Sequence, residues 1–420
     1  SKFMSTLSGA CIIAQSGGPT AAINASTYGA IITAMKRREI TRVLGARNGI
    51  RGVLDDNLVD LDKEEPYELE LLKYTPSSAL GSCRYKLKDP SEDDSDYRRI
   101  LDIFVKYGVR YFFYNGGNDS MDTCNKISKY CLEHGYECRV MGIPKTIDND
   151  LVETDHCPGY GSAAKYIATS MMEVYKDTHV YDIGTITVIE VMGRNAGWLA
   201  AASSLASLKG CGPDLIYLPE VPFDFDKFLE GADYFYKKNN HCVIVVSEGI
   251  RDKDGRYIVE YASSQARQKD SFGHAQMGGL AAYIADAVKN HIGAKVRGIE
   301  LSLLQRCASH WASHTDIDES FRAGRAAVEY AVEGLTGKMV GFQRVYDQGG
   351  NYRCDIKLID LEKVANKEKH VPIDWINATG DGLNEKFFDY ALPLIQGTVN
   401  IPIEDGLPRH ARLRMVKAMV

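Results

Sequence analysis

Residues 139–150 have the sequence RVMGIPKTIDND. The apolar run at residues 139–143 has the length and composition of a buried parallel strand. The loop that follows, residues 144–150, contains Lys145, Thr146, Asp148 and Asp150. Ligands of α/β proteins bind beyond the carboxyl ends of parallel strands. This stretch therefore predicts an α/β fold with functional side chains at the end of this strand.

Similar apolar runs recur along the chain and are separated by helix-length segments. The strands predicted in this way are residues 10–15, 42–46, 109–114, 139–143, 185–191, 215–218 and 242–247. Residues 22–37 and 162–176 are the clearest helices between them. Strand–helix alternation with short loops favours parallel sheets covered by helices. Residues 346–420 have a different pattern, with polar turns and a possible hairpin around Gly349 and Gly350.

The composition restricts the classes of function. The 420 residues carry a formal net charge of −6, which disfavours a broad nucleic-acid-binding face, so phosphate ligands need a local basic pocket. The ten cysteines form no CxxC pair, which favours reduced thiols in a cytoplasmic protein over a zinc site. No apolar run reaches the roughly 18 residues of a membrane span, and no signal peptide is evident near the start.

Two glycine-rich loops follow predicted strands and precede helices. Residues 16–20 are SGGPT and residues 115–120 are NGGNDS. Glycines at such a turn let backbone N–H groups approach an anion, although an ordinary capped turn has the same composition. Neither loop has the pattern of a dinucleotide fingerprint or of a P-loop.

The loop at residues 144–150 has the group types that phosphoryl transfer to an alcohol requires. Asp148 could accept a hydroxyl proton, Lys145 could neutralise phosphate charge, and Thr146 could orient either group. Further along the chain, Arg297 and Arg306 flank a predicted strand and could bracket a phosphate monoester, since guanidinium groups match its oxygens.

Taken together, these loops resemble the phosphofructokinase family over residues 10–345. The matching motifs are SGG at 16–18, LGSCR at 80–84, GGNDS at 116–120, PKTIDND at 144–150, EVMGR at 190–194, SEG at 247–249 and QR at 305–306. The resemblance implies reversible phosphoryl transfer to the C1 hydroxyl of fructose 6-phosphate, with Mg²⁺ as the cofactor.

The resemblance also implies a role for each matching residue. Asp148 is expected to be the general base, with Lys145, Asp119 and Arg194 beside the reacting groups. The donor-binding residues are expected to be Gly17, Gly18, Arg84, Gly117 and Ser120. The residues expected to bind fructose 6-phosphate are Thr146, Met192, Gly193, Glu248, Arg297 and Arg306, with Arg297 reaching a neighbouring subunit. Asn118 and Asp150 are the expected metal-site residues, and His274 is a candidate for the rim of the sugar site.

The implied fold is α/β, with two similar Rossmann-like domains, mostly parallel sheets and an active site in the cleft between them. Residues 1–160 with 306–345 are the expected donor-binding domain, and residues 161–305 the expected fructose 6-phosphate domain. Residues 346–420 are expected to form a C-terminal extension. The resemblance further implies a homodimer or homotetramer. The net charge and the lack of a long apolar run predict no nucleic-acid or membrane partner.

Asp119 favours pyrophosphate as the donor. ATP-using members of the family carry glycine at this position, and an aspartate there adds bulk and negative charge where ATP phosphates pass. Lys145 also resembles the pyrophosphate-using branch, although some ATP-using members share it. Asn118 departs from the usual aspartate, and a neutral amide is a poorer Mg²⁺ ligand. An ATP-dependent enzyme and a non-catalytic, sugar-phosphate-binding subunit therefore remain alternatives.

Overall fold

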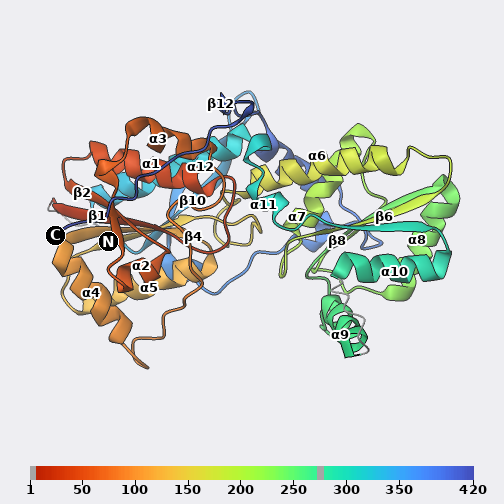
Figure 1. Cartoon of the computed structure of the whole chain (residues 1–420), viewed down its shortest axis with the longest axis horizontal. Helices are drawn as coiled ribbons and strands as arrows, with labels where there is room; N and C mark the ends of the chain where they lie inside the picture. The colour runs from red at the N-terminus through yellow and green to blue at the C-terminus, as the bar shows by residue number, and fades with distance from the viewer. Residues whose placement is uncertain (1–5, 272–278) are drawn as a thin grey trace. The chain divides into compact units, whose positions relative to one another are not determined.

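The computed structural model describes residues 6–271 and 279–420, and the chain divides into two compact units (Figure 1). Unit 1 contains Ser1–Ser162, Arg306–Lys367 and Gln396–Val420, and unit 2 contains Ala163–Gln305 and Glu368–Ile395. Residues 346–420, expected as one extension, therefore contribute to both units. His274 lies outside the described residues.

Unit 1 is built on a mixed, mostly parallel sheet. Its strand order is β11-β10-β5-β4-β1-β2-β3. The strands are β1 Gly9–Gln15, β2 Ile40–Ala46, β3 Leu58–Asp60, β4 Val109–Gly116, β5 Arg139–Pro144, β10 Lys338–Tyr346 and β11 Tyr352–Asp360. Strands β5, β4, β1 and β2 pair in parallel, whereas β3 and β11 are antiparallel to their neighbours. The strands predicted in this part of the sequence are confirmed.

Helices cover both faces of this sheet (Figure 1). Helix α1 (Ile23–Lys36) packs with α12 (His314–Glu333) on one face, and α4 (Ser95–Tyr107) with α5 (Asn118–Glu133) on the other. A Cβ on Gly324 of α12 would lie 1.8 Å from the Ser26 carbonyl oxygen of α1, so glycine permits this close approach. The shorter elements of unit 1 are α2 Ile50–Leu54, α3 Pro66–Glu70, α13 Leu361–Val364, β12 Ile403–Glu404 and β13 Leu407–Pro408, and α11 Leu304–Cys307 begins in unit 2 and ends in unit 1.

Unit 2 contains a four-stranded, all-parallel sheet in the order β7-β8-β6-β9 within the described residues. Its strands are β6 Thr185–Val191, β7 Leu215–Tyr217, β8 His241–Ser247 and β9 Lys295–Glu300. Its helices are α6 Tyr160–Thr178, which begins in unit 1, α7 Trp198–Ala202, α8 Phe225–Asn239, α9 Ile258–Ser271, α10 Leu280–Ile292 and α14 Glu385–Ala391. Arg297 was expected to flank a strand but lies inside β9.

The hairpin predicted around Gly349 and Gly350 is confirmed as the antiparallel β10–β11 pair. Strand β10 also pairs in parallel with β5, so the hairpin extends the sheet of unit 1. Among the described residues, none of the helices is both long enough and apolar enough to cross a membrane.

Candidate active site

Three loops meet at the carboxyl edge of the unit 1 sheet because β1, β4 and β5 are parallel neighbours. The loops are residues 16–20, residues 116–119 and residues 145–150. The backbone N–H of Lys145 donates to the Gly116 carbonyl (3.0 Å), which joins the second loop to the third. The first loop is joined to the LGSCR segment, since the Ser82 hydroxyl donates to the Gly17 carbonyl (2.6 Å). The sheet topology thus places the predicted donor loops together.

Lys145 lies at the centre of this edge. Its ammonium donates to the Gly18 carbonyl at 2.5 Å, and the residue is only 3% exposed. A Cβ on Gly17, which has φ +79°, would lie 2.9 Å from the Lys145 Nζ. A Cβ on Gly18 would lie 3.0 Å from a guanidinium nitrogen of Arg306. The glycine pair therefore leaves room for two cationic side chains beside the backbone of the loop.

Lys145 has both positively and negatively charged neighbours. The pKa of Lys145 is lowered from 10.5 to about 8: burial is the largest cause, the charges of Arg84 and Arg306 also lower it, and Asp148 and Asp150 act in the opposite direction. The depressed pKa therefore follows mainly from burial, which disfavours the charged form of the ammonium, and only in part from the neighbouring cations. An anion bound at this edge would relieve the repulsion among the cations.

The loop that carries Asp148 is held by its own polar groups. The Thr146 hydroxyl accepts from the backbone N–H of Asp148 (3.1 Å), and the Thr146 N–H donates to the Pro158 carbonyl (3.1 Å). Asn149 is buried in the left-handed conformation (φ +57°), and its side chain accepts from the Cys157 N–H at 2.8 Å. Asp148, by contrast, is only partly buried. The fixed backbone therefore presents the Asp148 carboxylate where solvent or a substrate can reach it.

The first turn of α5 follows β4 directly. A Cβ on Gly116 would lie 2.1 Å from the Ser120 hydroxyl, so Ser120 packs onto the loop, and Asp119 is exposed. The Asn118 side chain accepts from the Asn366 N–H and donates to the Lys367 carbonyl, both at 2.8 Å. Asn118 is thus hydrogen-bonded to the C-terminal part of unit 1.

A protein-only site for a divalent metal is not formed by Asp119, Asp148 and Asp150 among the described residues. The group whose ligand atoms lie within 4.8 Å of one another is His156, Glu319 and Cys354, all buried. There the His156 nitrogens are hydrogen-bonded to the Asp155 (2.8 Å) and Glu319 (2.7 Å) carboxylates. This group is a core ion-pair network. A metal ion near Asp148 and Asp150 fits only with further oxygen ligands, such as those of a bound phosphate substrate.

The His156 network was missed by the sequence analysis. Burial opposes the charged form of His156, but the Glu319 charge and the hydrogen bonds of Asp155 and Glu319 raise its pKa well above the usual value. The Tyr352 hydroxyl of β11 also donates to Glu319 at 2.6 Å. The partners lie up to 196 residues apart, so no local pattern could have revealed them.

Unit 2 has its own carboxyl edge, where β6 and β8 end side by side. The Gly193 N–H donates to the Glu248 carboxylate at 3.4 Å, and the Ser247 hydroxyl donates to the Gly193 carbonyl at 2.6 Å. A Cβ on Gly249 would lie 1.8 Å from the Arg194 carbonyl oxygen. The two motifs predicted to bind the sugar phosphate are therefore in direct contact.

The remaining predicted residues of unit 2 lie around these motifs. The Met192 N–H donates to the Gln305 side chain (3.1 Å), and the exposed Arg194 guanidinium lies over the Tyr257 ring at 4.8 Å. Tyr257 was not predicted, although an aromatic platform orients a guanidinium group. Arg297 is exposed on the edge strand β9 and forms an ion pair with Asp177 at 3.5 Å.

Glu190 is a further residue that the sequence analysis gave no role. It lies near the end of β6, and its carboxylate accepts from the Ala281 N–H at 2.8 Å. Burial, together with the charges of Glu300 and Glu248, raises the pKa of Glu190 from 4.5 to about 7, against the effect of the Ala281 hydrogen bond. The sequence does contain a signal for Glu190, because it is the single carboxylate in the apolar run TITVIEV.

The chain is similar in sequence and in fold to known proteins. A family model described as phosphofructokinase matches residues 10–330. The pyrophosphate--fructose 6-phosphate 1-phosphotransferase of Methylococcus capsulatus is 44% identical over 95% of this chain and 94% of its own, and that of Xanthomonas campestris is 43% identical over 97% of each. The crystal structure of a pyrophosphate-dependent phosphofructokinase from Nitrosospira multiformis is similar with a TM-score of 0.88, at 40% identity over 97% of each chain.

Proposed function

Because this chain belongs to the phosphofructokinase family, we propose that it transfers a phosphoryl group reversibly between magnesium pyrophosphate and the C1 hydroxyl of fructose 6-phosphate. The products are fructose 1,6-bisphosphate and phosphate. Pyrophosphate and fructose 6-phosphate are the substrates in the names of the relatives that match nearly the whole chain.

The observation that carries this proposal is the position of Lys145. It is a buried cation whose pKa is lowered to about 8, beside Arg84 and Arg306 and two carboxylates. Because positions 17 and 18 are glycines, the ammonium of Lys145 and the guanidinium of Arg306 can lie directly beside the backbone of this loop. Phosphoryl transfer is promoted mainly by positioning and by stabilising negative charge, which this arrangement supplies.

The chemical step follows from the residues of unit 1. Asp148 accepts the proton of the C1 hydroxyl as the hydroxyl oxygen bonds to a phosphorus of pyrophosphate. The bond from that phosphorus to the bridging oxygen breaks in line, and phosphate leaves with the electron pair. Lys145 and the N–H groups of the loops at Gly17 and Gly117 stabilise the departing charge. Thr146 keeps the backbone of Asp148 in place through its hydrogen bond.

The residues proposed to bind fructose 6-phosphate come from several motifs. Met192, Gly193, Arg194 and Glu248 belong to the two motifs that are in contact within unit 2. Thr146 and Arg306 are proposed on the family resemblance. Arg297, exposed on β9, is proposed to bind the sugar phosphate of a neighbouring subunit in a homodimer or homotetramer. The cytoplasm is the proposed location, in keeping with ten cysteines that are all free.

A divalent metal, proposed to be Mg²⁺, supplies charge neutralisation for pyrophosphate when it is bound. Asp148 and Asp150 lie close enough to Lys145 to affect its titration, and Asp119 lies on the first turn of α5. These carboxylates are the proposed protein contacts to the metal–pyrophosphate complex, with most ligands supplied by pyrophosphate and water.

Asp119 is the proposed determinant of the donor. Its exposed carboxylate lies beside the glycine loop at the start of α5, where the phosphates of ATP would meet a negative charge. The test is turnover of fructose 6-phosphate with Mg²⁺ and either pyrophosphate or ATP. Turnover with pyrophosphate alone is expected, and the D119G variant should gain use of ATP.

Two other results would each overturn part of the proposal. Turnover with ATP alone would keep the family and refute the role of Asp119. Binding of fructose 6-phosphate without turnover by either donor would favour a non-catalytic, sugar-phosphate-binding subunit.

A further inference from the structure

The amide of Asn118 holds the backbone of the C-terminal segment at two consecutive residues. Its Oδ1 accepts from the Asn366 N–H, and its Nδ2 donates to the Lys367 carbonyl, each at 2.8 Å. These partners are 248 and 249 residues away in the sequence. One side chain thus ties the first residue of α5 to the segment at which unit 1 ends.

This arrangement explains why residue 118 is an asparagine here. The pair of hydrogen bonds needs one donor and one acceptor on the same short side chain, which an amide provides. An aspartate carboxylate could accept from Asn366 but could not donate, and it would face the Lys367 carbonyl oxygen with a negative charge. The departure from the usual aspartate therefore matches a binding partner within the chain itself.

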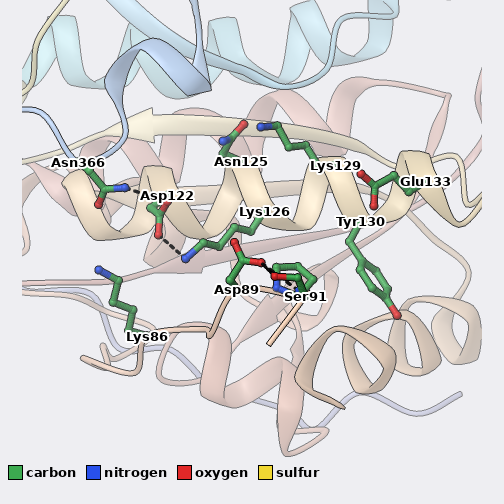
Figure 2. A pocket seen from close by; sticks show the side chains of 11 residues that line it. Lys86, Asp89, Ser91, Asp122, Asn125, Lys126, Lys129, Tyr130, Glu133 and Asn366 are labelled. Carbon is green, nitrogen blue, oxygen red and sulfur yellow. Dashed lines mark hydrogen bonds and ion pairs between the residues drawn. The ribbon is translucent and has the colours of Figure 1, made fainter. Parts of the chain in front are cut away.

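Other contacts hold the same segment against α5. Asn366 has a left-handed backbone (φ +62°), and its side chain donates to the Asp122 carboxylate at 3.4 Å, as Figure 2 shows. Lys129 of α5 forms an ion pair with Glu362 of α13. We call residues 366–367, together with the Asn118 amide that holds them, the clasp.

The clasp lies between the donor loop and a polar cavity. Asn118 and Asp119 form the first turn of α5, next to the glycine loop proposed to bind pyrophosphate. Farther along the same helix is a cavity of about 550 Å³, lined by Asp122, Asn125, Lys126 and Asn366 among others (Figure 2). Asn366 therefore belongs both to the clasp and to the wall of the cavity.

We propose that the clasp is a specificity-determining element that excludes the organic part of a nucleoside triphosphate from the face of α5. On this proposal, a nucleoside triphosphate whose phosphates lie on the glycine loop extends its nucleoside past the first turn of this helix. Residues 366–367 lie against that turn, and a bare pyrophosphate does not need the space. The clasp would act in addition to the charge of Asp119, and Asn118 is then a positioning residue.

The inference rests on the proposed donor site but can fail independently of it. The test compares the wild type with N118A and N118D, and with N125A as a matched control. Asn125 is on the same helix and lines the cavity without being part of the clasp. Hydrogen–deuterium exchange reports on the Asn366 amide, and calorimetry measures the binding of pyrophosphate and of magnesium β,γ-imido-ATP. None of these measurements requires turnover.

We expect faster exchange at Asn366 in N118A, which removes the acceptor of this N–H, and unchanged exchange in N125A. The loss of the hydrogen bonds should tighten binding of the ATP analogue about fivefold to tenfold relative to pyrophosphate, the range equivalent to one hydrogen bond. Unchanged exchange at Asn366 would refute the clasp. Faster exchange with the relative affinity unchanged within about twofold would refute its role in specificity.

The N118D variant also separates the clasp from a metal site. If residue 118 bound the metal directly, a carboxylate there should lower the Mg²⁺ concentration at which pyrophosphate binding is half-maximal. The clasp predicts no such decrease, because the side chain points to residues 366–367. A decrease in the required Mg²⁺ concentration in N118D would overturn the proposal. Failure of wild-type turnover would refute only the proposed reaction, since exchange and binding are measured separately.

Discussion

The carboxyl edges of the two sheets differ in their buried or partly buried charged groups: a lysine in unit 1 and a glutamate in unit 2. In unit 1, Lys145 and Arg306 lie beside Gly17 and Gly18, and the charge of Arg84 also acts on Lys145. In unit 2 the corresponding edge brings Glu190 and Glu248 together, with Glu300 nearby, and the pKa of Glu190 is raised by burial and by these charges. The same local architecture therefore serves ligands of different chemistry.

The difference agrees with the two substrates proposed for the chain. Pyrophosphate offers only anionic oxygens, which cations and backbone N–H groups can stabilise. A sugar offers hydroxyl groups, which carboxylates can accept from, and its one phosphate requires few cations. If this assignment is correct, substitutions at the two edges should affect different kinetic constants.

The largest effect is expected at Asp148. The D148N substitution removes the base while keeping the size of the side chain, so kcat should fall by about 10²–10⁴-fold. Calorimetric affinities for fructose 6-phosphate and pyrophosphate should change much less than kcat. Near-normal turnover of D148N would show that another group accepts the proton.

Lys145 is expected to affect the reaction with pyrophosphate more than the binding of fructose 6-phosphate. In K145M, kcat/KM for pyrophosphate should fall by about 10²–10³-fold, because a buried cation beside the transferring group is lost. The value of KM for fructose 6-phosphate should change little. K145R is the control, since it keeps the charge but adds bulk beside Gly17, where space is limited.

The pH dependence of the wild type tests the same residue. The pKa of Lys145 is about 8, so its charge is present below that pH and lost as the pH rises through it. Because kcat/KM reports on the free enzyme, its value for pyrophosphate should decrease above about pH 8. K145M should lack this decrease. An identical alkaline decrease in K145M would assign it to a different group.

A substitution at Gly249 is expected to weaken the binding of fructose 6-phosphate. In G249A, the added methyl group would meet the Arg194 carbonyl oxygen at 1.8 Å, which forces the loop at Gly193 and Arg194 to move. We expect KM for fructose 6-phosphate to rise by about 10–10²-fold, the cost of a displacement near 1 Å, while KM for pyrophosphate is nearly unchanged. The matched control is G231A in α8, where the nearest atoms are 3.5 Å from the new Cβ. An equal rise in both KM values would indicate general damage to the fold.

The sequence predicted these edges well because their signals are local. Each predicted strand ends within two residues of the end of an observed strand, and parallel pairing then brings the loops of β1, β4 and β5 together. The contacts that were missed depend on tertiary packing. Asn118 was expected near a metal, but its amide bonds to residues 248 and 249 positions away. The His156 network likewise depends on β11, whose pairing with β10 fixes the position of Tyr352.

The smallest expected effect concerns stability and tests the acidic edge of unit 2. The pKa of Glu190 is about 7 in the folded protein and near 4.5 when the group is solvated. The folded protein therefore retains a proton that the unfolded chain releases between these values, so the contribution of Glu190 to stability falls as the pH rises from 4.5 to 7. E190Q removes this titration while keeping an oxygen for the Ala281 N–H.

E190Q should accordingly be more stable than the wild type at pH 8 by about 1 kcal/mol, with little difference near pH 5. Thermal unfolding at both pH values measures the change. The control is E230Q on the exposed surface of α8, which should shift stability equally little at both pH values. The contrary result is that E190Q stabilises the protein equally at pH 5 and pH 8. That result would show that packing, and not the charge of the neighbouring carboxylates, accounts for the effect of residue 190.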